Sequence, residues 1–218
     1  MRGRIVSESP EAKRGEVVYE SLKERIVTLE LDPGTPLQEA EITRLYDASR
    51  TPVREALARL SHEGFLTRWG RGYRIRSFSP LEVKELYEVR EALEKMAVRL
   101  VIENTTKSKF GIIEEQLALY ETFIKSGDIK KFNAHANKFH MTIAELSDNR
   151  TLYESLRLIH EKVRIISARY LFKAESIQSA YDEHARIYHA ILRGDVVVAE
   201  AAMREHIQGV IEYFRTQL

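Results

Sequence analysis

The apolar residues of this chain change their spacing twice, and those changes limit the folds that it can adopt. Up to Gly64 they recur at helical intervals, beginning with Val18, Leu22, Ile26 and Leu29. The segment "FLTRWGRGYRIRSF" (65–78) instead predicts two short strands around Gly70-Arg71-Gly72, which is a hairpin signal. Beyond it the helical spacing returns and continues to the end of the chain. The chain is therefore predicted to be mainly α-helical, with one small sheet.

Turn-forming residues divide the segment before the hairpin into three helices. "LDPGTPL" (31–37) stops the first helix with two prolines and a glycine, and a short helix follows over 38–46. Asp47 is expected to end that helix in a left-handed conformation, which aspartate tolerates better than most residues. A third helix runs to His62 and ends at Gly64. Three helices followed by a hairpin predict a winged helix-turn-helix.

The third helix has an unusual charge pattern at its start. Ser49 or Thr51 can cap it, and Arg50 and Arg54 lie in its first turns. The positive end of a helix dipole ordinarily favours acidic side chains there. The apolar positions of this helix share one face and are predicted to be buried, namely Val53, Leu57 and Leu60. Either the arginines are an accident of surface charge, or a strongly anionic partner docks at this end.

Basic residues are concentrated in this part of the chain. Between Arg44 and Arg76 there are eight arginines and three acidic residues, so this stretch carries +5 while the whole chain carries +1 and the remainder −4. A localised basic stretch is typical of a small nucleic-acid-binding module, although a solvated basic face is the common alternative. If the third helix enters a major groove with its N-terminal end leading, its arginines can reach guanine N7 and O6. DNA then supplies the missing anion.

A helix start marks the beginning of a second domain. Ser79, Pro80 and Glu82 combine a cap, a proline at the first helical position and a capping box. Helices are predicted over 81–104, 107–126, 128–147, 150–173, 176–193 and 195–216, with Gly194-Asp195 as one of the breaks. The expected organisation is a disordered tail (1–14), a winged helix-turn-helix domain (15–78) and an all-helical domain (79–218).

The composition excludes several kinds of site. The chain has no cysteine, so any metal must use histidine and oxygen ligands. No apolar run approaches the roughly 18 residues that a membrane span needs. The N-terminal segment "MRGRIVSESPEAKRGE" lacks the apolar middle of a signal peptide, so a cytoplasmic protein is expected.

Two sets of segments resemble a known family. "SRTPVREALARLSHEGFLTRWGRGYRI", preceded by "LDPGTPLQEAEITRLY", resembles the winged-helix region of GntR-type bacterial transcription regulators. "LYEVREALEKMAVRL", "KFHMTIAELSDN" and "EHARIYHAILRGDVVVAEAAMREH" resemble the helical effector-binding domain, called FCD, of the FadR branch of that family. Together these segments cover nearly the whole chain.

The resemblance implies a homodimer that binds a short palindromic DNA operator, one half-site per subunit. The arginines of the recognition helix are then expected to contact bases, its hydroxyl residues phosphates or base edges, and the wing the minor groove. The residues concerned are Ser49, Arg50, Thr51 and Arg54 in the helix, and Arg71 and Gly72 in the wing. Arg74 is expected to contact a phosphate because of its charge.

Three histidines align with positions at which some members of the family bind a divalent metal, zinc or nickel. His140, His184 and His206 lie on three separately predicted helices. In those members an aspartate four residues before the first histidine completes the site, whereas this chain has Ala136. Asn137 could offer an amide oxygen, which is a weaker ligand than a carboxylate. The resemblance therefore implies a site of three histidines, with or without Asn137, or a site that has lost its metal.

Arg90 occupies a position at which the family commonly directs an arginine into the effector cavity. Its guanidinium can hold a carboxylate with two hydrogen bonds, so a small organic acid is the expected effector. The alternative is a surface pair between Arg90 and Glu94, four residues apart on one helix. Phe132 and Phe139 are expected in the core.

Three functions remain open from the sequence. The first is a dimeric regulator, a repressor, that releases its operator when a small carboxylate binds the helical domain, with or without a metal. The second is a regulator of the same family that binds a long acyl thioester without metal, which Ala136 keeps open. The third is a metal-dependent hydrolase, but no H-E-x-x-H motif supplies a general base beside the histidines.

Overall fold

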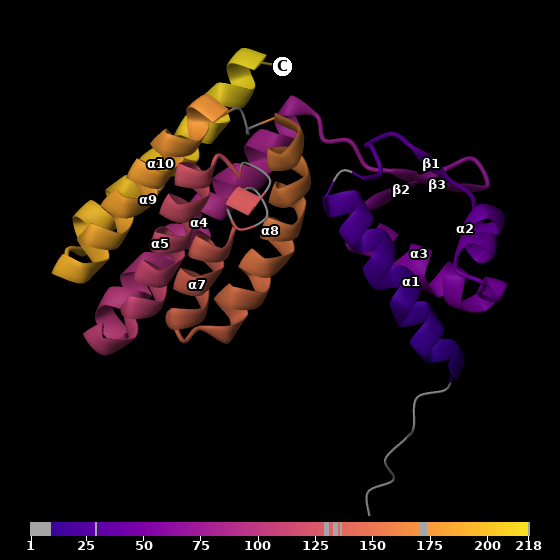
Figure 1. Ribbon diagram of the computed structural model, residues 1–218, viewed down its shortest axis with the longest axis horizontal. Helices are drawn as coiled ribbons and strands as arrows, with labels where there is room; N and C mark the ends of the chain where they lie inside the picture. The colour runs from indigo at the N-terminus through magenta and orange to yellow at the C-terminus, as the bar shows by residue number, and fades with distance from the viewer. Residues whose placement is uncertain are drawn as a thin grey trace, which may run out of the picture. The chain divides into compact units, whose positions relative to one another are not determined.

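Figure 1 shows the computed structural model of the chain, which describes residues 10–28, 30–128, 131–132, 135, 137–170 and 174–217. These residues form two compact units, with the division between Ser77 and Phe78. The described part of the first unit contains helices and a small sheet, and that of the second consists of helices and their connections. None of the described helices combines the length and the apolarity that crossing a bilayer requires.

The first unit is built on the helices α1 (Pro10–Val27), α2 (Glu39–Leu45) and α3 (Arg50–His62). The apolar stripe predicted for α1 is buried at Val18, Leu22 and Ile26, and Leu29 lies outside the described residues. The stripe predicted for α3 is fully buried at Val53, Leu57 and Leu60. These buried faces hold α1 and α3 together in the core of the unit.

The helix α1 begins at Pro10, inside the segment that was expected to be disordered. Two contacts with the α3 region anchor its first turns. Glu11 accepts a hydrogen bond from Ser49 Oγ at 3.2 Å, and Glu16 accepts one from Arg59 at 2.8 Å. Apolar periodicity starts only at Val18, so polar contacts made in the folded unit could not be seen in the spacing.

The predicted hairpin is present as β2 (Leu66–Trp69) and β3 (Gly72–Ile75). A further strand, β1 (Pro36–Leu37), was not predicted; it pairs antiparallel with β3 and gives the sheet order β1-β3-β2. Two residues carry no period of their own, so pairing with β3 decides this strand. The strands β1 and β3 approach each other closely here: a Cβ added to Gly72 would lie only 2.9 Å from the Leu37 carbonyl oxygen.

Several of the residues predicted to start and end helices do so. Asp47 follows α2 with φ of 44°, and Gly64 follows α3 with φ of 83°. Ser79 Oγ accepts the Glu82 backbone N–H while the Glu82 carboxylate accepts the Ser79 N–H, which completes the capping box. Asp195 accepts a backbone N–H at 3.0 Å and caps the last helix.

The second unit contains α4 (Pro80–Asn104), the 3₁₀ turn η1 (Lys107–Lys109), α5 (Gly111–Ser126), α7 (Lys138–Leu146), α8 (Arg150–Tyr170), α9 (Ala174–Arg193) and α10 (Val196–Gln217). The helix predicted over 128–147 is interrupted: residues 131, 132 and 135 are helical, Asn137 lies in a turn, and α7 begins at Lys138. Residues 129–130, 133–134 and 136 lie outside the described residues.

The helices of the second unit pack side by side around one core (Figure 1). α4 packs along α10 and also contacts α7, α8 and α9, while α5 contacts α7 and α9. Phe132 and Phe139 are buried, as predicted. The same unit also buries charged and polar side chains: Arg90, Glu94, His140, His160, His184 and His206. Burying such groups costs free energy unless they are partnered, so their contacts identify the candidate site.

Candidate DNA interface and metal centre

The start of α3 exposes the side chains that were predicted to meet DNA. Ser49 is the N-cap residue, but its hydroxyl donates to Glu11 and makes no capping hydrogen bond. The first turn of α3 contains no acidic residue, and Arg50, Thr51 and Arg54 are all exposed. The positive end of this helix therefore presents arginines and hydroxyl groups to solvent.

An acidic residue from the preceding helix contacts one of these arginines. Glu39, in the first turn of α2, accepts a hydrogen bond from Arg54 Nε at 2.8 Å. The Arg54 side chain is 65% exposed, whereas that of Glu39 is 24% exposed. Arg54 is thus held at one edge of its guanidinium while much of the group stays open to solvent.

The wing places its two predicted arginines differently. Arg71, at the hairpin tip, is exposed. Arg74 lies on the central strand β3, half-buried, with its guanidinium 4.6 Å from the centroid of the Trp69 ring. Its Nε is buried and has no hydrogen-bond partner within the described ranges. Arg71 is therefore open to a ligand at the tip, whereas Trp69 holds Arg74 against the sheet.

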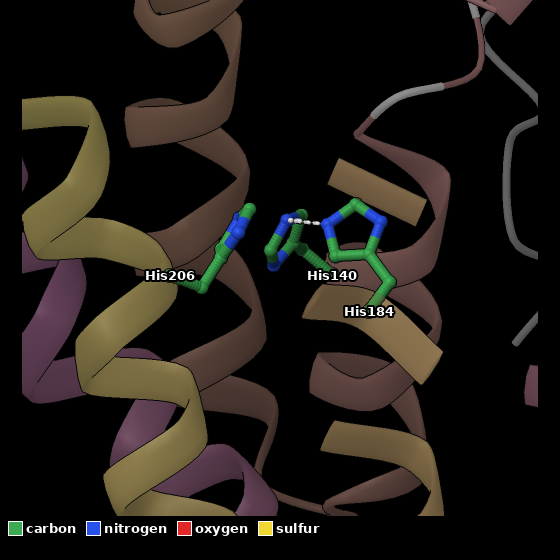
Figure 2. Close-up of side chains that lie close together, drawn as sticks. All are labelled: His140, His184 and His206. Carbon is green, nitrogen blue, oxygen red and sulfur yellow. Dashed lines mark hydrogen bonds between the residues drawn. The ribbon is translucent and has the colours of Figure 1, made fainter. Parts of the chain in front are cut away.

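In the second unit three histidines converge from three helices. His140 of α7, His184 of α9 and His206 of α10 are buried, and one ring nitrogen from each lies within 4.8 Å of the others. Figure 2 shows the three rings pointing toward one another, with His140 Nε2 and His184 Nε2 separated by 3.1 Å. The structure thus brings together all three histidines that the sequence placed on separate helices.

Two carboxylates fix the orientation of two of these rings. Glu94 of α4 accepts a hydrogen bond from His140 Nδ1, and Glu183 of α9 accepts one from His206 Nδ1 at 2.7 Å. When Nδ1 donates in this way, Nε2 carries the lone pair that a metal ligand requires. His184 Nδ1 is buried without a hydrogen-bond partner among the residues that the structure describes.

Arg90 is buried against the same glutamate. Its Nε donates to Glu94 Oε1 at 2.6 Å, so the pair considered from the sequence exists, but in the core and not on the surface. The same Glu94 oxygen lies 3.1 Å from Nε2 of His160, on α8, without the alignment of a hydrogen bond. Glu94 therefore contacts one guanidinium and two imidazoles inside the bundle.

Burial sets the protonation of this cluster. It lowers the pKa of His140 to about 3, an effect that Glu94 opposes and Arg90 increases. Burial also holds the pKa of His184 well below its usual range. Burial alone would raise the pKa of Glu94, but the charge of Arg90 and the contacts with His140 reverse this and hold it well below the usual value. At neutral pH the two imidazoles are neutral, the form that binds metal ions.

Asn137 lies beside the cluster, but the contact described for its amide is with another histidine. Asn137 Oδ1 is 3.3 Å from His160 Nδ1. His160 was not considered from the sequence, and it joins Asn137 to Glu94. Ala136, the residue at the expected aspartate position, lies outside the described residues.

The donor set fits a divalent first-row metal ion. Three imidazoles suit zinc or nickel, and carboxylates behind metal-binding histidines commonly fix their tautomers. His140 and His184 direct Nε2 atoms at each other across 3.1 Å, and His184 leaves its other nitrogen unpartnered in the core. A cation bound between these rings would be coordinated by the Nε2 lone pairs, which face each other across this short distance.

Comparison with known proteins assigns both units to families. Residues 14–74 match the bacterial regulatory proteins of the gntR family, and residues 85–209, more than half of the chain, match the FCD domain. This protein is a GntR-family transcription regulator with an FCD domain. The resemblance seen in its recognition-helix and helical-domain segments is thereby confirmed.

Relatives along most of the chain support the same assignment. LutR, an HTH-type transcriptional regulator of Bacillus subtilis (strain 168), is 31% identical over 203 residues, which cover 83% of this regulator and 92% of LutR. The HTH-type transcriptional repressor RspR of Escherichia coli (strain K12) is 27% identical over 202 residues, which cover 91% of this regulator and 87% of RspR. A GntR regulator from Rhodococcus sp. RHA1 shares the fold, with a TM-score of 0.83 at 20% identity over 94% of this chain and 99% of that one. These families and relatives are regulators, which sets the hydrolase hypothesis aside.

Three residues that contact the regulator's clustered histidines had no role assigned from the sequence. Glu94 was considered only as a surface partner of Arg90. Glu183 was not singled out although it directly precedes His184, and no spacing pattern pointed to His160. Helical spacing reports neighbours on one helix, whereas each of these residues contacts a different helix. A search for acidic residues able to orient the histidines could have raised Glu94 and Glu183 as candidates.

Proposed function

We propose that this regulator is a homodimeric repressor of the FadR branch, controlled by a small carboxylate that binds at a metal held by the histidine cluster. The observation that carries the proposal is the convergence of three buried imidazoles, two of them oriented by carboxylates, in the domain that follows the winged helix. Burying polar rings costs free energy unless they are hydrogen-bonded, and His184 leaves Nδ1 without a hydrogen-bond partner among the described residues.

DNA is proposed to bind the exposed start of α3 and the wing. In this proposal Arg50 and Arg54 read base edges, and Ser49 and Thr51 contact phosphates or bases. Arg71 enters the minor groove from the hairpin tip, Gly72 lets the strands approach closely beneath it, and Arg74 contacts a phosphate. The exposure of the helix residues and of Arg71 supports this assignment.

The metal is proposed to be held by His140, His184 and His206, with the Asn137 amide as a further oxygen beside them. When bound, a zinc or nickel ion supplies a positive position for one carboxylate oxygen of the effector. Arg90 is proposed to bind the effector with the N–H groups that remain beyond its contact with Glu94. Charged and polar groups at this depth favour a small anion over a long acyl chain, which would leave them unsolvated.

Release of DNA follows if effector binding changes the dimer. Each subunit reads one half-site, so the distance between the two α3 helices must match the operator spacing. An effector that binds better to a dimer with another spacing shifts the population toward that dimer and lowers the affinity for the operator.

The Arg54→Ala variant tests the DNA assignment. If Arg54 reads a base, the variant should lose about 1 to 3 kcal/mol of binding free energy on its preferred duplex and should accept any base at one operator position. Sequencing of duplexes that wild type and variant each enrich from a random pool measures the preference. A uniform loss on all duplexes would instead assign Arg54 to the backbone.

The His184→Ala variant tests the metal centre, with His189→Ala as a matched control from the exposed face of the same helix. Wild type and control, purified without added metal, should each retain about one zinc or nickel ion per chain, and His184→Ala should retain far less. Addition of zinc at about 100 times its Kd should raise the unfolding free energy of stripped wild type by about 2.7 kcal/mol.

Elemental analysis and melting curves measure both effects. Equal and negligible metal in all three proteins, with no zinc-dependent rise in Tm, would contradict the metal centre. A panel of small organic acids and acyl thioesters in the same melting assay then separates the two kinds of effector.

A further inference from the structure

We infer that Glu39 is a positioning residue for base recognition: its carboxylate holds Arg54 so that the Nη1 and Nη2 end of the guanidinium is the edge offered to DNA. The inference rests on the proposed role of Arg54 in contacting a base. It adds a residue on α2, outside the recognition helix, to the determinants of operator specificity.

In the pair of Glu39 and Arg54, the carboxylate is the fixed partner and the guanidinium is the group presented to solvent. Glu39 Oε2 lies 2.8 Å from Arg54 Nε, and the two residues belong to different helices that pack against each other. The carboxylate side chain is 24% exposed while the arginine side chain is 65% exposed. The acid is therefore the better-fixed partner, and the arginine extends from it toward solvent.

The contact with Glu39 uses the Nε group of the Arg54 guanidinium and leaves both Nη groups available to DNA. Arginine donates from Nε and from both Nη groups in a planar fork, and guanine accepts two parallel hydrogen bonds at O6 and N7. Because Glu39 occupies Nε, the two Nη groups form the edge that remains for a bidentate contact with a base. A side chain that is ordered before binding also loses less conformational entropy when the complex forms.

Stability alone does not account for an acid at this place. An ion pair with this exposure contributes little to folding, because solvent screens it. A carboxylate on a surface that faces phosphates also weakens non-specific binding by repulsion. Glu39 therefore has two effects: it orients Arg54 for one base, which raises specificity, and its charge lowers the affinity for every duplex by a similar factor.

Arg50 provides an internal comparison. It is exposed beside the same helix end, and no hydrogen bond to an acidic side chain is found for it within the described part of the chain. Loss of Glu39 should therefore relax base preference at the operator position that Arg54 reads and leave the position read by Arg50 unchanged.

The experiment compares Glu39→Ala with Glu41→Ala, which removes the same charge from the same first turn of α2 at an exposed position. The probes are the duplex that wild-type protein enriches from a random pool and a scrambled duplex of equal composition. Glu39→Ala should lose roughly 3- to 10-fold in affinity for the selected duplex per half-site and gain affinity for the scrambled one. Glu41→Ala should change its affinity for both duplexes by the same factor.

A double-mutant cycle identifies the route of the effect. In the Arg54→Ala background, Glu39→Ala should cause no further fall in the ratio of selected to scrambled affinity, because the residue acts through Arg54. Glu39→Gln, which keeps the size of the side chain and loses its charge, serves if the alanine variant unfolds; melting curves report the folded fraction of each protein.

The possible failures are distinguishable. If Arg54→Ala keeps the wild-type base preference, the proposed DNA role of Arg54 is wrong. If Arg54→Ala loses that preference but Glu39→Ala and Glu39→Gln keep the affinity ratio of Glu41→Ala, the positioning role is wrong and the DNA role stands. A gain of affinity in Glu39→Ala that is larger for the selected duplex would make Glu39 a competitor of DNA and would also overturn the inference.

Discussion

The affinity of this regulator for its operator should fall by about 10³- to 10⁵-fold between about 50 and about 200 mM salt. The proposed dimer makes about 6 to 10 phosphate contacts, and each contact releases counterions from the duplex, so the logarithm of affinity falls linearly with the logarithm of salt. The concentration of positive charge between Arg44 and Arg76 in a chain of net charge +1 is the source of this dependence. Fluorescence anisotropy with the selected duplex, repeated over a series of salt concentrations, gives the slope.

Two variants, each lacking one arginine, test whether the salt dependence comes from the DNA-binding unit. Arg74→Ala should reduce the magnitude of the slope by about 1 for each phosphate contact that is lost. Arg99→Ala removes an arginine that pairs with Glu200 at 2.6 Å in the helical unit, and it should leave the slope unchanged. A slope near zero for wild type would mean that phosphate contacts do not govern binding.

The Glu94→Ala variant should lower the free energy of unfolding by about 3 to 5 kcal/mol. Glu94 is 1% exposed and contacts the buried Arg90 guanidinium together with His140 and His160. Removal of the carboxylate leaves Arg90 charged in the core without its counter-ion, which costs far more than the loss of a surface pair. Urea denaturation monitored by circular dichroism measures the change.

Glu88→Ala is the matched control on the same helix. Glu88 pairs with Lys84 at 3.3 Å, but both side chains are more than half exposed, so its loss should cost less than about 1 kcal/mol. The double variant Arg90→Met with Glu94→Leu should recover much of the stability, because no unpaired charge remains buried. Equal costs for Glu94→Ala and Glu88→Ala would show that Glu94 does not stabilise the buried guanidinium.

Glu94→Ala should also weaken zinc binding by about 10- to 100-fold, because the carboxylate holds the His140 tautomer that presents Nε2. This second measurement separates orientation of the ligand from stability of the fold. A variant that binds zinc like wild type while losing stability would leave Glu94 with a structural role alone.

Local signals in the sequence were sufficient for most of the secondary structure. The capping box of Ser79 and Glu82, the left-handed Asp47 and the hairpin at Gly70 depend on residues a few positions apart, so they could be recognised directly. The strand at Pro36 and the early start of α1 at Pro10 depend on partners far along the chain. Their formation is decided by pairing that no local pattern records.

For the candidate sites, some residues were identified from the sequence and others only from the structure. The three histidines and Arg90 came from the family resemblance, and exposure of Arg54 followed from its position away from the apolar stripe of its helix. The residues that contact them could not be predicted from the sequence. Glu39, Glu183 and His160 gained their importance only when separate helices brought them into contact with an arginine or a histidine.

The sequence by itself determined which segments are helices and strands, where most of them end, and which helix presents arginines at its positive end, because these properties depend on periodicity, caps and charge along a short stretch. Only the tertiary structure decided that Arg90 and Glu94 form a buried pair and not a surface one, and that three distant imidazoles share one centre. Burial and proximity between helices depend on packing, and packing is a property of the whole chain.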